Sequence, residues 1–152
     1  MDDTPVMFAN NRYPRITTAG HEIALSVLFE TGILHFAGGP KEYTELADVP
    51  KDFLKKIPVA WDETRLVDGV PGQFCVIARR SGQNWYVGGI EGAGQEREVT
   101  LKLPFLGEGK WTATFIEDGL EARRDSRSRR RISVPRIRGR SACVPTAGSR
   151  RF

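Results

Sequence analysis

The 152 residues are enough for one compact domain or for parts of two, and a hydrophobic share of 39% with 28% charged residues is ordinary for a globular protein. No stretch approaches the roughly 18 apolar residues of a membrane span, and the amino terminus lacks the basic and apolar regions of an export signal. The net charge of +4 is uneven, because residues 1 to 120 carry 12 Lys or Arg against 17 Asp or Glu and residues 121 to 152 carry 11 against 2, which indicates a compositional boundary near residue 120.

The first periodic segment, residues 18 to 31, predicts a helix with a threonine cap and Gly32 at its stop position. Apolar side chains cover most of its circumference, so another layer must bury it. Residues 33 to 37 are apolar and lie between glycines, the pattern of a buried strand. A helix followed by a buried strand indicates an α/β layer. A short helix with Pro50 at its first position is expected over residues 49 to 57.

From residue 61 onward the apolar residues recur with a period of two, which predicts antiparallel strands. Val99, Leu101 and Leu103, for example, alternate with polar residues, so each strand offers one apolar face. Such a face needs a second sheet to cover it, which predicts a β-sandwich. The five expected strands, separated by segments rich in turn residues, cover residues 63 to 68, 73 to 80, 85 to 90, 97 to 103 and 110 to 117.

The last segment, residues 120 to 152, shows neither the helical period nor the strand period in its apolar residues, and its cations are all arginine. We expect it to be disordered. Closely spaced cations bind phosphate without needing a fold, so nucleic-acid binding by this basic tail is one alternative function, although the tail lacks interleaved aromatic residues.

The histidines and cysteines form no metal-binding or catalytic pattern. His21 and Glu22 are adjacent on the expected helix and point about 100° apart, while His35, in an apolar strand, is interpreted as a hydrogen-bonded core residue. Cys75 and Cys143 lack the spacing of a metal site or of a disulfide framework, and Cys75 lies in an apolar run where a small buried residue is expected. We therefore predict no metal site in this chain.

Four aromatic residues admit two interpretations. They could form a platform that stacks on sugar rings, as in a non-catalytic carbohydrate-binding β-sandwich module. They could instead fill the space between two sheets, because each buries a large apolar area, and this core interpretation is favoured. The four are Trp61, Trp85, Tyr86 and Trp111.

Several short phrases are more specific than the composition. They are residues 1 to 5 (MDDTP), 21 to 30 (HEIALSVLFE), 58 to 65 (PVAWDETR), 76 to 82 (VIARRSG) and 85 to 89 (WYVGG). Over residues 1 to 119 these phrases resemble glycoside hydrolase family 97, of α-glucosidase type, and the WDETR and IARRSG phrases are the most specific.

The resemblance implies a division of the chain, because family members have a (β/α)8 catalytic barrel followed by a carboxy-terminal β-sandwich. Residues 1 to 60 would be the end of the barrel, with residues 33 to 37 as its last strand, and residues 61 to 119 an incomplete sandwich. The expected fold class is therefore mixed: a remnant of a (β/α)8 barrel, then an antiparallel β-sandwich, then a disordered basic tail over residues 120 to 152.

The resemblance also implies a function, because family members hydrolyse α-glucosidic or α-galactosidic bonds with carboxylates and a calcium ion near the substrate. Glycosidases need two carboxylates about 5 to 9.5 Å apart, and the sequence singles out no such pair. Asp62 with Glu63 and Glu117 with Asp118 lie at strand ends or turns, where acidic residues are common. The family's carboxylates are expected upstream of the MDDTP phrase, so no catalytic, calcium-binding or substrate-binding residue is assigned.

We therefore expect a carboxy-terminal fragment of a family 97 enzyme that acts on α-glucosides or related oligosaccharides and is inactive alone. Full-length relatives are often exported or periplasmic. The Arg-rich tail replaces the closing strands expected after residue 119, which suggests a truncated, frameshifted gene. The apolar helix would then be left partly uncovered, and the chain would tend to aggregate.

Overall fold

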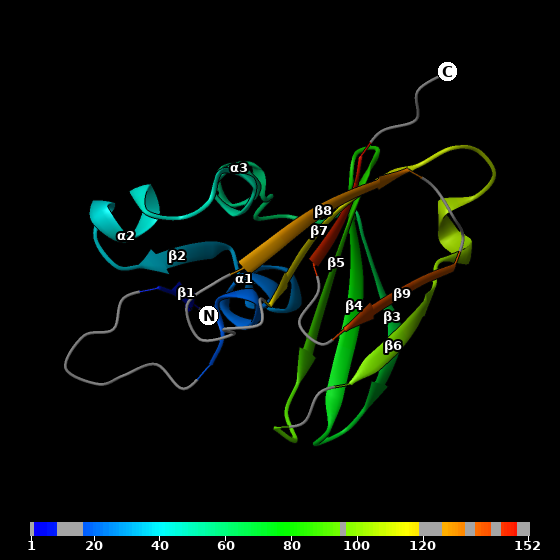
Figure 1. The fold of residues 1–152 in the computed structure, drawn as a ribbon, viewed down its shortest axis with the longest axis horizontal. Coiled ribbons are helices and arrows are strands. Elements are labelled where there is room, and N and C mark those ends of the chain that lie inside the picture. The colour runs from blue at the N-terminus through cyan, green and yellow to red at the C-terminus, as the bar shows by residue number, and fades with distance from the viewer. Residues whose placement is uncertain are drawn as a thin grey trace.

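The computed structural model describes residues 2–8, 17–94, 97–118, 126–132, 136–140 and 144–148. Over these residues the chain is rich in antiparallel β-sheet and has few helices. An α/β layer lies against one face of the largest sheet, and a two-stranded sheet lies at the other (Figure 1). None of the helices in this described part is long and apolar enough to cross a membrane.

The amino-terminal part forms the α/β layer. Strands β1 (Asp2–Met7) and β2 (Ile33–Ala37) pair in parallel, and α1 (Ala19–Leu28) lies between them in sequence. Parallel neighbours need such a crossover, because the end of one strand lies far from the start of the next. Helices α2 (Pro40–Thr44) and α3 (Asp48–Lys56) follow β2. The expected helices near residues 18 to 31 and 49 to 57 are thus confirmed, with the first one shorter.

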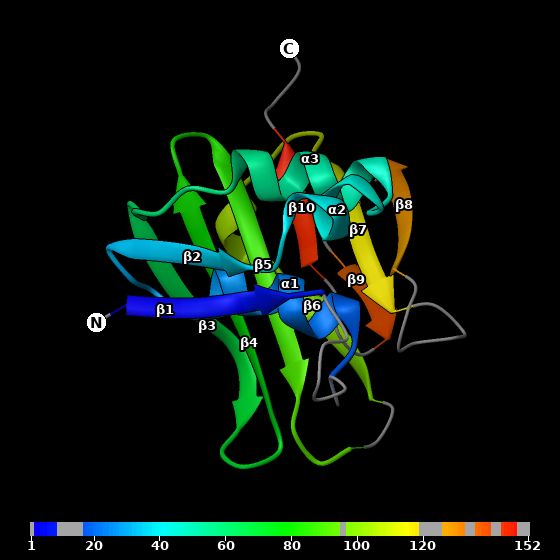
Figure 2. The same cartoon turned by 90° about the vertical axis from the view of Figure 1, so that its left-hand side faces the viewer.

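The expectation that residues 33 to 37 form a buried strand is half right. The strand is present as β2, but Ile33 at its start is 55% exposed and His35 is exposed. Within the described residues β2 has β1 as its neighbour in a two-stranded sheet, and Figure 2 shows this pair on the outside of α1. The interpretation of His35 as a core residue was therefore wrong.

The six-stranded sheet is antiparallel throughout and has the order β3-β4-β5-β10-β7-β8. Its first three strands form a meander along the chain. Strand β10, from near the end of the chain, lies between β5 and β7. The strands are β3 (Glu63–Val70), β4 (Phe74–Ser81), β5 (Asn84–Glu91), β7 (Thr112–Asp118), β8 (Ser126–Ile132) and β10 (Val144–Gly148).

A two-stranded antiparallel sheet, β6 (Glu98–Lys102) with β9 (Arg136–Arg140), lies near the other face of the large sheet. Strand β6 and the 3-10 turn at Pro104–Leu106 bring apolar side chains against β4 and β5. The expected β-sandwich is present. Its core contains Val76, Ala78, Trp85, Val87, Leu101, Leu103 and Leu106.

At β5 the large sheet is buried on both faces, as alternation along this strand shows. Trp85 and Val87 belong to the sandwich core, whereas Tyr86 between them belongs to a second core under the helices. This helix-side core joins α1 and α3 to the sheet. Its buried members are Ile23, Ala24, Val27, Leu28, Phe53, Leu54, Tyr86 and Ile116.

We expected residues 120 to 152 to be disordered, and this prediction was wrong for the part that forms three strands, β8, β9 and β10. The composition of this tail offers little apolar burial, which is why disorder was expected. Strands β5, β6 and β7, however, present backbone groups that pair with any extended segment, whatever its side chains. Residues 120–125, 133–135, 141–143 and 149–152 of the expected tail lie outside the described residues.

Candidate functional site

The two most specific phrases of the sequence lie opposite each other in the structure. The first, residues 61 to 65, opens β3, and the second, residues 77 to 82, closes β4. The two strands are antiparallel neighbours, with Glu63 opposite Arg80 and Thr64 opposite Arg79. Because Arg79 and Arg80 are consecutive on a strand, their side chains point to opposite faces.

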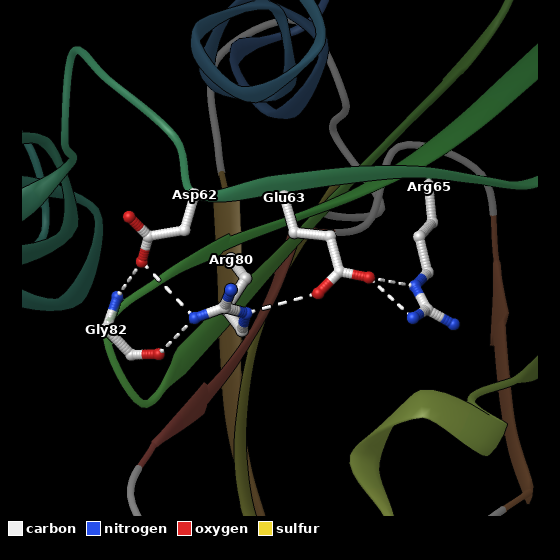
Figure 3. A network of polar contacts seen from close by, with 5 residues as sticks. All are labelled: Asp62, Glu63, Arg65, Arg80 and Gly82. Carbon is white, nitrogen blue, oxygen red and sulfur yellow. Dashed lines mark hydrogen bonds and ion pairs between the residues drawn. The ribbon is translucent and has the colours of Figure 1, made fainter.

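On the sandwich side, at the end of β4, the half-buried Arg80 joins a network of polar contacts (Figure 3). Its guanidinium lies 3.3 Å from Asp62 and 3.2 Å from Glu63, and it donates to the Gly82 carbonyl at 3.0 Å. Asp62 in turn accepts from the Gly82 amide at 2.7 Å. Hydrogen bonds from Arg65 and then from Arg80 lower the pKa of Glu63. These carboxylates hold a turn, and the pairing of Glu63 with arginine disfavours the protonated form that a general acid needs.

On the helix side, the side chain of Arg79 is 5% exposed and makes several contacts. One terminal nitrogen donates to Glu30 at 2.6 Å and to the Thr64 hydroxyl at 3.2 Å. The other terminal nitrogen donates to the Leu28 carbonyl, in the last turn of α1, at 3.0 Å. The guanidinium carbon also lies 5.8 Å from the ring centroid of Trp61. Arg79 thus caps the carboxyl end of α1 with a positive charge.

The opposite end of α1 meets a carboxylate. Asp118, the last residue of β7, accepts from the Thr18 hydroxyl at 2.8 Å and from the Gly20 amide at 3.0 Å. Thr18 is the N-cap residue, and its hydroxyl oxygen accepts from the His21 amide at 3.1 Å. A negative charge at the amino end of a helix satisfies free amides and complements the helix dipole.

Between these two ends, α1 lies directly on the backbone of β5. A β-carbon added at Gly88 would be 2.9 Å from the Val27 β-carbon and 3.0 Å from the Ala24 carbonyl oxygen. Atoms essentially never approach so closely, so only glycine permits this helix position.

The aromatic residues considered as a sugar platform lie in different places. Trp85 is 4% exposed in the sandwich core, with its ring centroid 4.3 Å from that of Phe105, while Tyr86 is 6% exposed in the helix-side core. Trp61 packs against Tyr86 at 5.3 Å, and Trp111 packs against the sandwich core. Burial raises the pKa of Tyr86. The core interpretation is confirmed for Trp85 and Tyr86. The partly buried Trp61 and Trp111 pack against different cores, so the four residues lie on opposite faces of one sheet and form no single platform.

The remaining sequence candidates are scattered. His21 is half-buried beside the N-cap, and Cys75 is half-buried against the helix-side core. Cys143 and the side chains of the basic tail lie outside the described residues, so nucleic-acid binding stays a prediction. Across the described ranges no three His, Cys, Asp or Glu side chains gather to hold a metal ion.

Sequence reasoning missed the roles of Arg79 and Asp118. The one signal for Arg79 was an arginine next to the apolar residues Ile77 and Ala78, in a strand otherwise suited to burial. A buried arginine needs partners. Nothing in the local sequence marks Asp118, because its partners lie 98 and 100 residues away.

Comparison with known proteins identifies relatives of this chain. A family model described as "Glycosyl-hydrolase 97 C-terminal, oligomerisation" matches residues 60–141, and so extends past residue 119 into the Arg-rich part. A probable retaining alpha-galactosidase of Streptomyces bingchenggensis is 41% identical over 120 residues, which are 78% of this chain and 18% of that protein. A retaining alpha-galactosidase of Bacteroides thetaiotaomicron is 35% identical over 118 residues, again 78% of this chain and 18% of that protein.

Solved structures share the fold. A beta-arabinopyranosidase is 26% identical with a TM-score of 0.77, and the match covers 95% of this chain and 23% of that one. A family 97 enzyme of Pseudoalteromonas sp. strain K8, in complex with panose, is 24% identical with a TM-score of 0.86, and the match covers all of this chain and 26% of that one. At that identity the second likeness speaks for the fold alone.

Proposed function

The chain belongs to glycoside hydrolase family 97, and from this premise we propose that it supplies the carboxy-terminal part of an enzyme that hydrolyses α-galactosides. The observation that carries the proposal is the 41% identity, over 120 residues, to a probable retaining alpha-galactosidase. The chain spans only 18% of that relative, so the activity belongs to a larger enzyme. The α-glucosidase type expected from the sequence has weaker support, because the structure with panose is 24% identical.

We further propose that β1, α1 and β2 are the last β/α units of a (β/α)8 barrel, against which the sandwich packs. Support comes from the parallel pairing of β1 with β2 and from the crossover helix between them, because this is the repeating unit of such barrels. The exposure of Ile33 and of Phe29, at 55% and 46%, is consistent with further barrel elements covering this layer.

The catalytic carboxylates and the calcium ion implied by the family resemblance would be held by other parts of the parent enzyme. The acidic residues best placed for chemistry have structural partners: Asp62 and Glu63 pair with Arg80, and Asp118 caps α1. The described residues do not fit a calcium site, since no three carboxylates among them gather. The role proposed for this chain is to support the barrel.

An exchange experiment tests this function. The corresponding part of the Bacteroides thetaiotaomicron enzyme would be replaced by this chain, and hydrolysis of p-nitrophenyl α-galactopyranoside and α-glucopyranoside would be measured. We expect the chimera to regain activity that a truncated enzyme lacks, with the galactoside preferred, and the chain alone to cleave neither. A chimera no better than the truncated enzyme, or cleavage by the chain alone, would refute the proposal.

A second candidate role is self-association, named as oligomerisation in the description of the matching family model. Leu66 favours it, because this side chain is 71% exposed on β3, the outermost strand of the large sheet. Light scattering of the chain and of Leu66→Glu tests the idea. A dimer that becomes a monomer on Leu66→Glu, but not on Val59→Glu in the exposed segment before β3, is the expected result. A monomeric unchanged chain would exclude this role.

A further inference from the structure

Helix α1 is held on the large sheet by opposite charges from two different strands. Asp118 at the end of β7 accepts from the Gly20 amide, and Arg79 on β4 donates to the Leu28 carbonyl, each at 3.0 Å. The signs of both charges complement the helix dipole. The sheet therefore contacts both ends of the helix, as well as its apolar face.

Apolar packing is not the only interaction that sets where α1 lies along the sheet. The hydrophobic effect is non-directional and depends on buried area, and the face of α1 toward the sheet is built of Ile23, Ala24 and Val27. The close contact of Ala24 and Val27 with Gly88 limits a shift of the helix, but this contact is near its middle and does not define either end. Hydrogen bonds to charged groups, in contrast, need short distances and defined angles.

Such a shift would also separate the charge of Arg79 from its partners on the α1 side. Its side chain is 5% exposed, so a guanidinium that lost its partners would remain away from water, which is strongly unfavourable. The terminal nitrogen that donates to the Leu28 carbonyl would lose its acceptor. The other would lose Glu30, which follows α1, and would keep only Thr64 on β3. The helix position that gives both terminal nitrogens of Arg79 an acceptor is also the one that lets Asp118 accept from the Gly20 amide.

We propose that Arg79 and Asp118 are positioning residues that fix α1, and the α/β layer built on it, in one place on the sandwich. The layer then stays folded only while both caps are made. Loss of either cap releases α1 before the sheet unfolds. This inference concerns how two parts of this chain are joined and does not depend on the sugar that the parent enzyme cleaves.

Hydrogen exchange of backbone amides in the full chain tests the proposal, because it reports on each element separately. The variants are Arg79→Ala and Asp118→Asn. We expect the amides of residues 23 to 28 to exchange on the order of tenfold faster in each variant, as loss of a charged hydrogen bond implies. The amides of β4 and β5 should change much less. The matched control is Arg80→Ala, whose side chain lies on the face of the sheet opposite α1, and it should leave the α1 amides unchanged.

Three results would overturn the proposal. One is α1 amides that stay as slow as in the unchanged chain. Another is equal acceleration of the α1 and β4–β5 amides, which would indicate a general loss of stability. The third is an effect of Arg80→Ala on α1 as large as that of Arg79→Ala. If Arg79→Ala does not fold, Asp118→Asn and Arg79→Lys, which keeps the charge but not the branched set of donors, are judged by the same three results.

Discussion

Arg79 and Asp118 cap opposite ends of a single ten-residue helix, although they stand on different strands, β4 and β7. In the sheet those strands are separated by β5 and β10. The spacing between the two charges is therefore set by sheet geometry, and a helix of matching length fits between them. The sequence between residues 19 and 28 supplies that length, and Gly88 under the middle of the helix allows the close approach.

The close approach at Gly88 predicts that Gly88→Ala destabilises the chain by about 1 to 3 kcal/mol, the usual cost of overpacking a core. The added carbon would lie 2.9 Å from Val27 and would push α1 off the sheet. Urea denaturation measures the change. Gly32→Ala is the matched control, since nothing lies within 4 Å of a β-carbon there, and it should be neutral or slightly stabilising. Equal effects of the two substitutions would contradict the expected close packing.

The main elements were predictable because their sequence periods are strong. The apolar residues of helix α1 and of strand β6 recur with periods of 3.6 and 2 residues, because each element buries one face against a core. The glycine and polar residues between β4 and β5 likewise predict the turn that joins these two strands in a hairpin. These patterns depend on residues close together in the chain, and such patterns can be recognised in a single sequence.

The missed elements depend on partners far away in the chain. Strand β1 holds two aspartates and a proline, and β8 holds four arginines, so neither resembles a strand by composition. Both pair with a neighbour whose backbone groups need partners. The roles of Arg79 and Asp118 were missed for the same reason. A helix cap that comes from another element has no fixed distance in sequence from the helix that it caps.

Core packing of the helix side predicts a graded cost for Ile116, which is 1% exposed. Ile116→Val removes one buried methylene-sized group and should cost about 0.5 to 1.5 kcal/mol. The comparison is Leu66→Val, at a side chain 71% exposed, which should change stability by less than about 0.5 kcal/mol. Thermal unfolding measures both. A larger effect at Leu66 than at Ile116 would show that the assigned burial is wrong.

The lowered pKa of Glu63 predicts a pH dependence of stability. Arg65 and Arg80 stabilise its charged form in the folded state, so the contribution is fully present above the ordinary carboxyl pKa. It is lost as the pH falls through the lowered value. The urea midpoint of the unchanged chain should therefore exceed that of Glu63→Gln at pH 7, and the two should converge as the pH falls below the lowered value. The exposed Glu108→Gln is the control. A gap between the chain and Glu63→Gln that widens in acid would contradict the assignment.

The positions of the tryptophans predict that sugars will not quench their fluorescence through stacking. Trp85 is 4% exposed, and Trp61 has the Arg79 guanidinium over its ring and packs against Tyr86, so neither ring offers a free face of the kind a pyranose covers. Titration with galactose, an α-galactoside and malto-oligosaccharides should leave the emission of the folded chain unchanged. Acrylamide, which also reaches partly exposed indoles, is the positive control. Saturable quenching by any of these sugars would restore the carbohydrate-binding module as a function and would point to Trp111 or to residues outside the described ranges.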